Sequence, residues 1–176
     1  IIKEVKVGGN TRDPINSFCI NPSGSNIAIV NNEGVYILDT EGSILKSKEA
    51  EGPYFYDSSQ KRHIAWSPDN NYIVYESIAD GEKTVNVWNI ETNLVSKVMQ
   101  ATIRNHERIS SFVISPDSKY IVIAMLSPSN INNTVLKVWD VQTNKQIIDS
   151  QDYDSVIADL SFSHDGKYLG LAFRDG

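Results

Sequence analysis

The sequence predicts an all-β fold of repeated four-stranded antiparallel sheets that stack against one another. Three observations predict it: one related stretch recurs four times, each copy ends in a turn, and further strand-like runs follow. The copies are separated by about 46 to 48 residues, a spacing typical of repeat architectures. They are residues 15–22, 61–68, 109–116 and 157–164.

Each copy predicts a first strand followed by a chain reversal. Two large apolar residues alternate with one intervening residue, which places both side chains on one face of a strand. These pairs are Phe18 and Ile20, Ile64 and Trp66, Phe112 and Ile114, and Leu160 and Phe162. The turns that follow begin at Asn21, Ser67, Ser115 and Ser163 and combine Pro, Asp, Asn and Gly, which favour reversals.

Three more strands are expected in each unit. The second strands, at residues 26–30, 72–77, 120–125 and 168–173, are apolar on both faces, as in sheets covered on both sides. The third strands are expected at residues 34–39, 84–89 and 134–140. The fourth strands are expected at residues 43–48, about 94–99 and 145–149, and their polarity suits an outer edge in contact with water.

Two short motifs carry a family resemblance. Val87-Trp88-Asn89 and Val138-Trp139-Asp140, together with the Ser-Pro-Asp turns at Ser67 and Ser115, resemble the WD40 repeat family over essentially the whole chain. The resemblance implies a β-propeller of about four consecutive blades, the last incomplete, within a larger ring of about seven. The expected blades are residues 15–49, 61–100, 108–150 and 156–176, with residues 1–7 forming the outer strand of a preceding or closing blade.

The resemblance also implies a hydrogen-bonded network inside each blade, formed by a His, a Ser or Thr, a Trp and an Asp. The second unit offers Ser77, Asp80 and Trp88, and the third offers His106 and Trp139. Both sets are incomplete. We therefore expect apolar packing between blades to supply most of the stability.

Composition narrows the range of functions. The net charge of -6 and the pI near 5.0 argue against direct nucleic-acid binding, which depends on clustered Lys and Arg. A membrane span would need about 18 consecutive apolar residues, and the sequence has no such run. The single cysteine, Cys19, excludes an internal disulfide and indicates an intracellular protein, cytoplasmic or nuclear.

No residues stand out as catalytic or metal-binding. His63 and His164 are expected to be structural or surface residues, His106 to belong to the blade network, and Cys19 to be a small buried hydrophobe. We therefore expect neither enzymatic activity nor a metal or cofactor.

The longest connections are residues 49–60, 100–107 and 127–133. In the WD40 family the connections of these types open on one face, and loops on a rigid scaffold commonly bind partners. Residues 127–133 themselves are expected to form a flexible polar insertion.

Several side chains on this face could contact a partner. Tyr54, Phe55 and Tyr56 are either contact anchors or packed over a seam between blades. Arg104, Glu107 and Arg174 are either polar contacts at the rim or solvated charges.

We therefore expect a protein-interaction scaffold that binds a peptide or a partner protein as a subunit of a multiprotein complex. Two alternatives remain. One is the non-catalytic propeller of a multidomain enzyme, prolyl-peptidase-like or TolB-like, and the other is the sensor propeller of a signalling ATPase.

Overall fold

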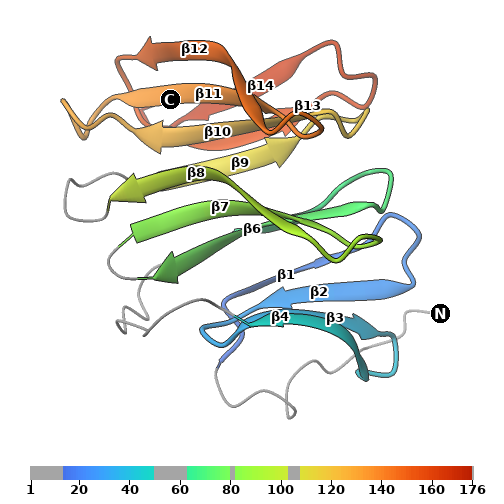
Figure 1. Ribbon diagram of the computed structural model, residues 1–176. Helices are drawn as coiled ribbons and strands as arrows, with labels where there is room; N and C mark the ends of the chain where they lie inside the picture. The colour runs from blue at the N-terminus through green and yellow to red at the C-terminus, as the bar shows by residue number, and fades with distance from the viewer. Residues whose placement is uncertain (1–13, 50–62, 80–81, 103–107, 176) are drawn as a thin grey trace.

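The computed structural model describes residues 14–49, 63–79, 82–102 and 108–175, and every regular element in them is a β-strand. The strands form four antiparallel sheets that follow one another in chain order (Figure 1). Three sheets have four strands and the last has two. This arrangement confirms the predicted all-β fold of consecutive blades with an incomplete last one. No helix long and apolar enough to cross a membrane occurs in these residues.

Each sheet is a meander in which every strand pairs with the next strand along the chain. The first sheet contains β1 (Ser17–Ile20), β2 (Asn26–Val30), β3 (Gly34–Asp39) and β4 (Ile44–Glu49). The second contains β5 (Ile64–Trp66), β6 (Tyr72–Ala79), β7 (Glu82–Asn89) and β8 (Val95–Thr102). The third contains β9 (Ile109–Ile114), β10 (Tyr120–Leu126), β11 (Thr134–Asp140) and β12 (Lys145–Tyr153), and the fourth contains β13 (Ile157–Phe162) and β14 (Leu169–Phe173).

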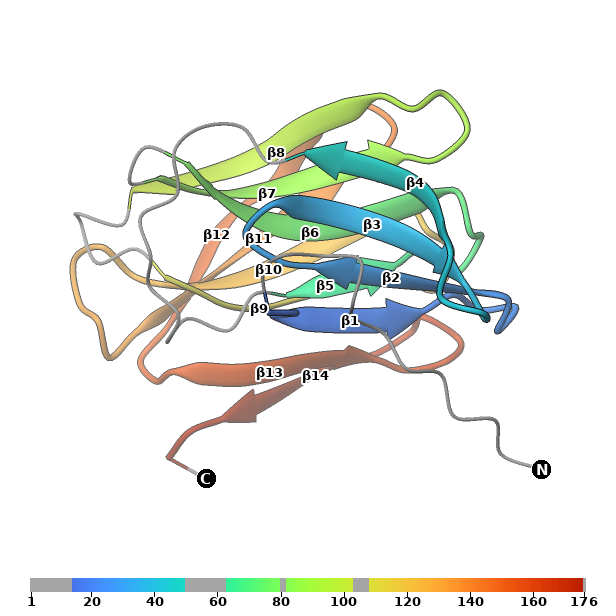
Figure 2. The same cartoon turned by 90° about the horizontal axis from the view of Figure 1, so that it is seen from below.

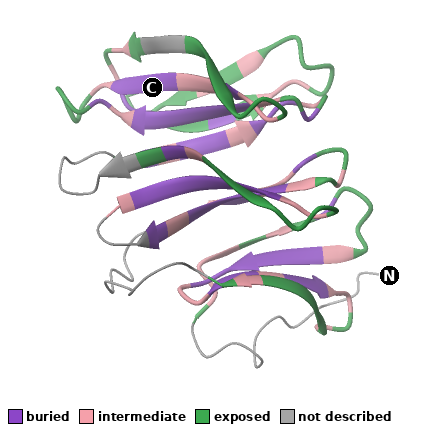
Figure 3. Ribbon diagram, in the orientation of Figure 1, coloured by how far each residue is buried: buried purple, intermediate pink, exposed green. Residues whose placement is uncertain are grey.

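The first strands of the sheets lie innermost. β1 contacts β5, β5 contacts β9, and β9 contacts β13, so the first strands lie next to one another around a common axis (Figure 2). The fourth strands β4, β8 and β12 lie on the outside, where most of their residues are exposed (Figure 3). Each sheet therefore runs from an inner first strand to its outer strands, and the sheets radiate from this axis as propeller blades do.

Apolar side chains fill the three seams between sheets. Ala28, Val35 and Ile37 of the first sheet pack with Ile73 and Trp88 of the second. The seam between the second and third sheets is the largest cluster, and a third cluster joins the third sheet to the fourth. The central strands β2, β6 and β10 are buried along most of their length, as expected for strands covered on both faces.

The turns after β5, β9 and β13 repeat one hydrogen-bond pattern. In the third sheet the Ser115 hydroxyl donates to Asp117 Oδ1 at 2.6 Å and accepts from the Tyr120 N–H at 2.9 Å. The second and fourth sheets repeat both bonds. Ser118 and its equivalents have positive φ: 64° at Asn70, 61° at Ser118 and 71° at Gly166. The predicted turn residues therefore close the strands through their side chains as well as their backbones.

Two outer strands extend further than the sequence suggested. β8 continues to Thr102 and β12 to Tyr153, where they pair with Glu82 and Thr134 at the starts of β7 and β11. The sequence predicted a connection at residues 100–107 and an end of the other strand at residue 149. An edge strand needs only its backbone to pair on one side, so polarity does not end it.

Candidate functional site

The two ends of the sheets differ. At one end, which we call the turn end, turns join strand one to strand two and strand three to strand four. At the other, the loop end, strand two leads into strand three and each fourth strand leads into the next sheet. The described connections at the loop end are residues 31–33, 127–133, 154–156 and 174–175.

The longest of these connections is held by its own side chains. The Ser127 N–H donates to the Asn133 carbonyl at 2.9 Å, and the Asn132 N–H donates to Asn130 Oδ1 at 3.0 Å. Asn133 Nδ2 in turn donates to Asp154 Oδ1 at 3.2 Å, which ties this loop to the turn before β13. The sequence predicted a flexible insertion because these residues are small and polar. In the structure, the Ser127 and Ser129 hydroxyls share a hydrogen bond at 2.9 Å, and Asn130 Nδ2 donates to Asn133 Oδ1 at 3.0 Å.

Arg174 lies at the loop end, as predicted, and is exposed. Its backbone N–H donates to the Val156 carbonyl at 2.9 Å, and the next residue, Asp175, accepts a hydrogen bond from the Ser155 hydroxyl at 2.6 Å. These contacts fix the backbone that carries the guanidinium and leave its side chain at the surface. The other predicted contact residues, Tyr54, Phe55, Tyr56, Arg104 and Glu107, lie outside the described residues.

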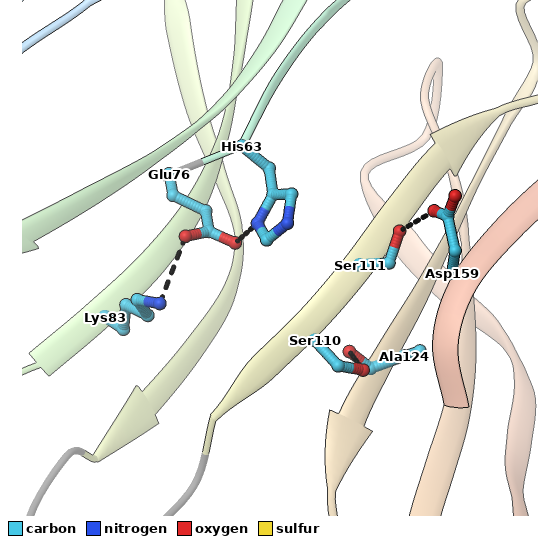
Figure 4. A network of polar contacts seen from close by, with 7 residues as sticks. All are labelled: His63, Glu76, Lys83, Ser110, Ser111, Ala124 and Asp159. Carbon is cyan, nitrogen blue, oxygen red and sulfur yellow. Dashed lines mark hydrogen bonds and ion pairs between the residues drawn. The ribbon is translucent and has the colours of Figure 1, made fainter. Parts of the chain in front are cut away.

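A cluster of charged side chains lies at the loop end of the second sheet (Figure 4). Glu76 on β6 is fully buried, and its Oε1 lies 2.8 Å from His63 Nδ1, just before β5. Its Oε2 lies 3.2 Å from the Nζ of Lys83 on β7, which is 3% exposed. That contact is an ion pair but does not meet hydrogen-bond geometry, so Oε2 lacks a hydrogen-bond donor among the described residues.

His63 is the exposed member of this cluster, with 29% of its side chain accessible. Its ring packs edge-on against Phe112 of the third sheet, with the ring centroids 5.9 Å apart. Figure 4 shows its second nitrogen, Nε2, pointing away from Glu76. The sequence placed His63 in a first strand as a structural or surface residue and missed the cluster.

The expected blade network is arranged differently where it can be seen. The single indole N–H of Trp88, which is fully buried, donates to Asn93 Oδ1 at 3.0 Å in the turn before β8. Ser77 instead bonds Thr84 Oγ1 at 2.7 Å and accepts from Asn86 Nδ2 at 2.8 Å. Trp139 is likewise buried. The remaining members, Asp80 and His106, lie outside the described residues.

Cys19 has the chemistry of a packed side chain. It packs with Trp66 against the seam between the first two sheets. Burial raises the pKa of its thiol to about 12, while a hydrogen bond with the Trp66 backbone lowers it by less. Since the thiolate is the nucleophile, Cys19 is unreactive near neutral pH. Among the described residues, no group of three or more His, Cys, Asp or Glu is placed to hold a metal ion.

The sequence of the chain matches a known protein family. The family described as eukaryotic translation initiation factor eIF2A matches residues 2–158, most of the chain. The chain belongs to this family. The match runs through the first three sheets and ends at the start of β13.

Solved structures share the fold. A crystal structure of a eukaryotic initiation factor aligns with a TM-score of 0.60 at 17% identity, over 83% of this chain and 34% of that one. A computationally designed protein, Ika4, aligns with a TM-score of 0.64 at 18% identity, over 100% of this chain and 95% of that one. A chain of the mitotic checkpoint complex aligns with a TM-score of 0.60 at 20% identity, over 92% and 48%. At these identities the likeness shows the fold alone.

The chain spans about a third of the length of the initiation factor to which it aligns. A comparison with curated protein sequences gives no match. What the chain binds has to be argued from its own residues.

Proposed function

We propose that this chain is a binding platform of a translation initiation factor, which holds a protein or peptide partner on its loop end within a larger assembly. The family suggests that the chain acts in translation initiation. The arrangement of the loop end suggests which surface binds the partner. The proposal has no chemical step and needs no cofactor. It locates the chain inside the cell, where translation takes place.

The observation that carries the proposal is the fixed geometry of the loop end. The turn end consists of repeated tight turns whose polar groups bond one another, as Ser115 and Asp117 do. At the loop end, contacts such as Asn133 to Asp154 and Ser155 to Asp175 order the backbone around exposed side chains, among them Arg174. Surfaces ordered before binding lose less conformational entropy when a partner docks.

A protein partner fits the charge better than RNA does. The net charge of -6 repels phosphate, whereas rim charges on a protein surface steer a partner of opposite charge. Neither the enzyme-linked nor the ATPase-linked alternative is favoured by an observation in the described residues.

Affinity capture tests this proposal with variants matched between the two ends. Arg174→Glu reverses an exposed charge at the loop end, and Lys167→Glu reverses one at the turn end, where the side chain is 73% exposed. We expect the loop-end variant of the full chain to capture less of the translation initiation proteins from a cell extract, and the turn-end variant to match the wild type. Equal loss in both variants, or in neither, would refute the assignment of the loop end.

A further inference from the structure

The charged cluster is not required by the fold, because other sheets build the same position from apolar residues. Counted from the first residue of each turn, Glu76 corresponds to Val30 in the first sheet and Ala124 in the third. The strand pairing agrees, because Val30 lies opposite Ser17, Ala124 opposite Ser111, and the Glu76 N–H donates to the His63 carbonyl. Both apolar equivalents are buried to within 1% exposure.

The equivalent polar positions of the third sheet join that sheet to the next. Ser111, which corresponds to His63, donates to Asp159 Oδ1 at 3.1 Å across the seam. Thr134, which corresponds to Lys83, accepts the Ile157 N–H at 2.8 Å across the same seam. The polar groups of His63, Glu76 and Lys83 bond instead within their own sheet (Figure 4). The cluster therefore does not serve to hold two sheets together through hydrogen bonds.

Burying a carboxylate in a seam carries a large desolvation cost, and replacing such a charge set by apolar residues is often neutral or stabilising. Stability is consequently a weak explanation for Glu76. Its evident effect is on His63: a carboxylate that accepts from Nδ1–H fixes the ring orientation and the tautomer. With Nδ1–H donating to Glu76, the second ring nitrogen, Nε2, points away from the carboxylate, and in the neutral ring it is a hydrogen-bond acceptor.

The surroundings decide which group Nε2 suits. The chain carries a net charge of -6, and its described connections at the loop end include the carboxylates Glu33, Asp154 and Asp175. A basic partner group is attracted to such a surface and can donate a hydrogen bond to neutral Nε2.

Few other titratable groups face His63 from the strands packed against β5. β2 and β9 contain none, and β1 contributes only Cys19, whose raised pKa keeps it a thiol. β6 contributes Glu76 together with Tyr72 at the turn end and Tyr75, which packs into the seam with the first sheet.

We infer that His63, oriented by the buried Glu76, is a binding residue of the loop end whose Nε2 accepts a hydrogen bond from a Lys or Arg side chain of a basic peptide segment. This deepens the proposed function and rests on it. No bond is made or broken.

The test uses two substitutions that separate the ring nitrogens. Asn places an amide near the position of Nδ1, so His63→Asn keeps the contact with Glu76 and removes Nε2. Gln places an amide near the position of Nε2, so His63→Gln keeps an acceptor there. Asp165→Asn at the turn end serves as the control for a single polar change on the exposed surface.

The probe is a fluorescein-labelled peptide of alternating arginine and serine, with a glutamate and serine peptide as its counterpart, and the readout is fluorescence anisotropy on the full chain. We expect wild type and Asp165→Asn to bind the arginine peptide and not the glutamate peptide. His63→Asn should bind the arginine peptide about tenfold more weakly, since one charge-assisted hydrogen bond is lost. His63→Gln, which keeps an acceptor near the position of Nε2, should bind the arginine peptide more tightly than His63→Asn.

The outcomes separate this inference from the proposed function. Equal affinity of wild type and His63→Asn, equal affinity of His63→Gln and His63→Asn, no binding of the arginine peptide, or preference for the glutamate peptide would each overturn the role of His63. Loss of partner capture by Arg174→Glu with unchanged peptide binding by His63→Asn would leave the proposed function standing and overturn only this inference. Circular dichroism of each variant confirms that it has folded.

Discussion

Removing one charge from the buried cluster should destabilise the chain far more than removing both. In Lys83→Met the side-chain volume is nearly kept, but Glu76 Oε2 loses the ion pair at 3.2 Å and already lacks a hydrogen bond. Glu76 is 0% exposed and Lys83 3%, so water cannot take the place of the missing partner. Breaking a buried pair from one side costs about 3 to 5 kcal/mol, and we expect a loss in this range.

The reverse single substitution, Glu76→Met, leaves the Lys83 ammonium buried and should cost a similar amount. The double variant Glu76→Met with Lys83→Met removes both charges and should lie within about 1 kcal/mol of the wild type, because seams of this fold accept apolar residues here. Urea unfolding followed by circular dichroism, with a double-mutant cycle, measures the coupling. Additive losses in the double variant would show that the two charges do not compensate each other, and would refute this account of the cluster.

Three further predictions follow from individual contacts. Thr134→Val keeps the side-chain shape but leaves the buried Ile157 N–H without its acceptor, so urea unfolding should show a loss of about 1 to 3 kcal/mol. Cys19, whose pKa burial raises to about 12, should react with a thiol reagent at neutral pH only under unfolding conditions, and rapid reaction of the folded chain would contradict its burial. The Ser115 hydroxyl lowers the pKa of Asp117 below its usual 3.8, so the stabilisation is present above that value and is lost as the pH falls through the lowered one. Ser115→Ala should therefore shift the urea midpoint at neutral pH more than in strong acid, and an equal shift at both would argue against the hydrogen bond.

Most strands could be predicted because each repeat carries two signals. One is the alternation of apolar residues in the first strand, and the other is the set of turn residues that follows it. Ile64, Phe112 and Leu160 are all buried, as the alternation required. Phe18 has the same pattern in the first sheet, yet it is 63% exposed. The alternation shows that one face of the strand can pack against a neighbouring sheet. It does not show whether the described residues include a sheet on that side.

The charged cluster could not be found residue by residue, because His, Glu and Lys each resemble surface residues when taken alone. The signal lies in a comparison of equivalent positions between the repeats. A Glu within the otherwise apolar run of β6 stands where the first sheet has Val30 and the third has Ala124. Once strand register is known, Lys83 lies on β7 and His63 lies just before β5, on the two sides of Glu76. Sequence alone gives the order of strands, whereas the cluster depends on register between strands.

The sheets contain two kinds of buried polar group. Thr134 meets the backbone of the next sheet, so its hydroxyl is explained by the need to satisfy the Ile157 N–H. Glu76 satisfies no group of a neighbouring sheet, and Val30 shows that the seam packs without it. A buried charge that neither completes the backbone nor joins two sheets has to be explained by what it orients. Here that is His63, the one member of the cluster whose side chain is substantially accessible to a partner at the loop end.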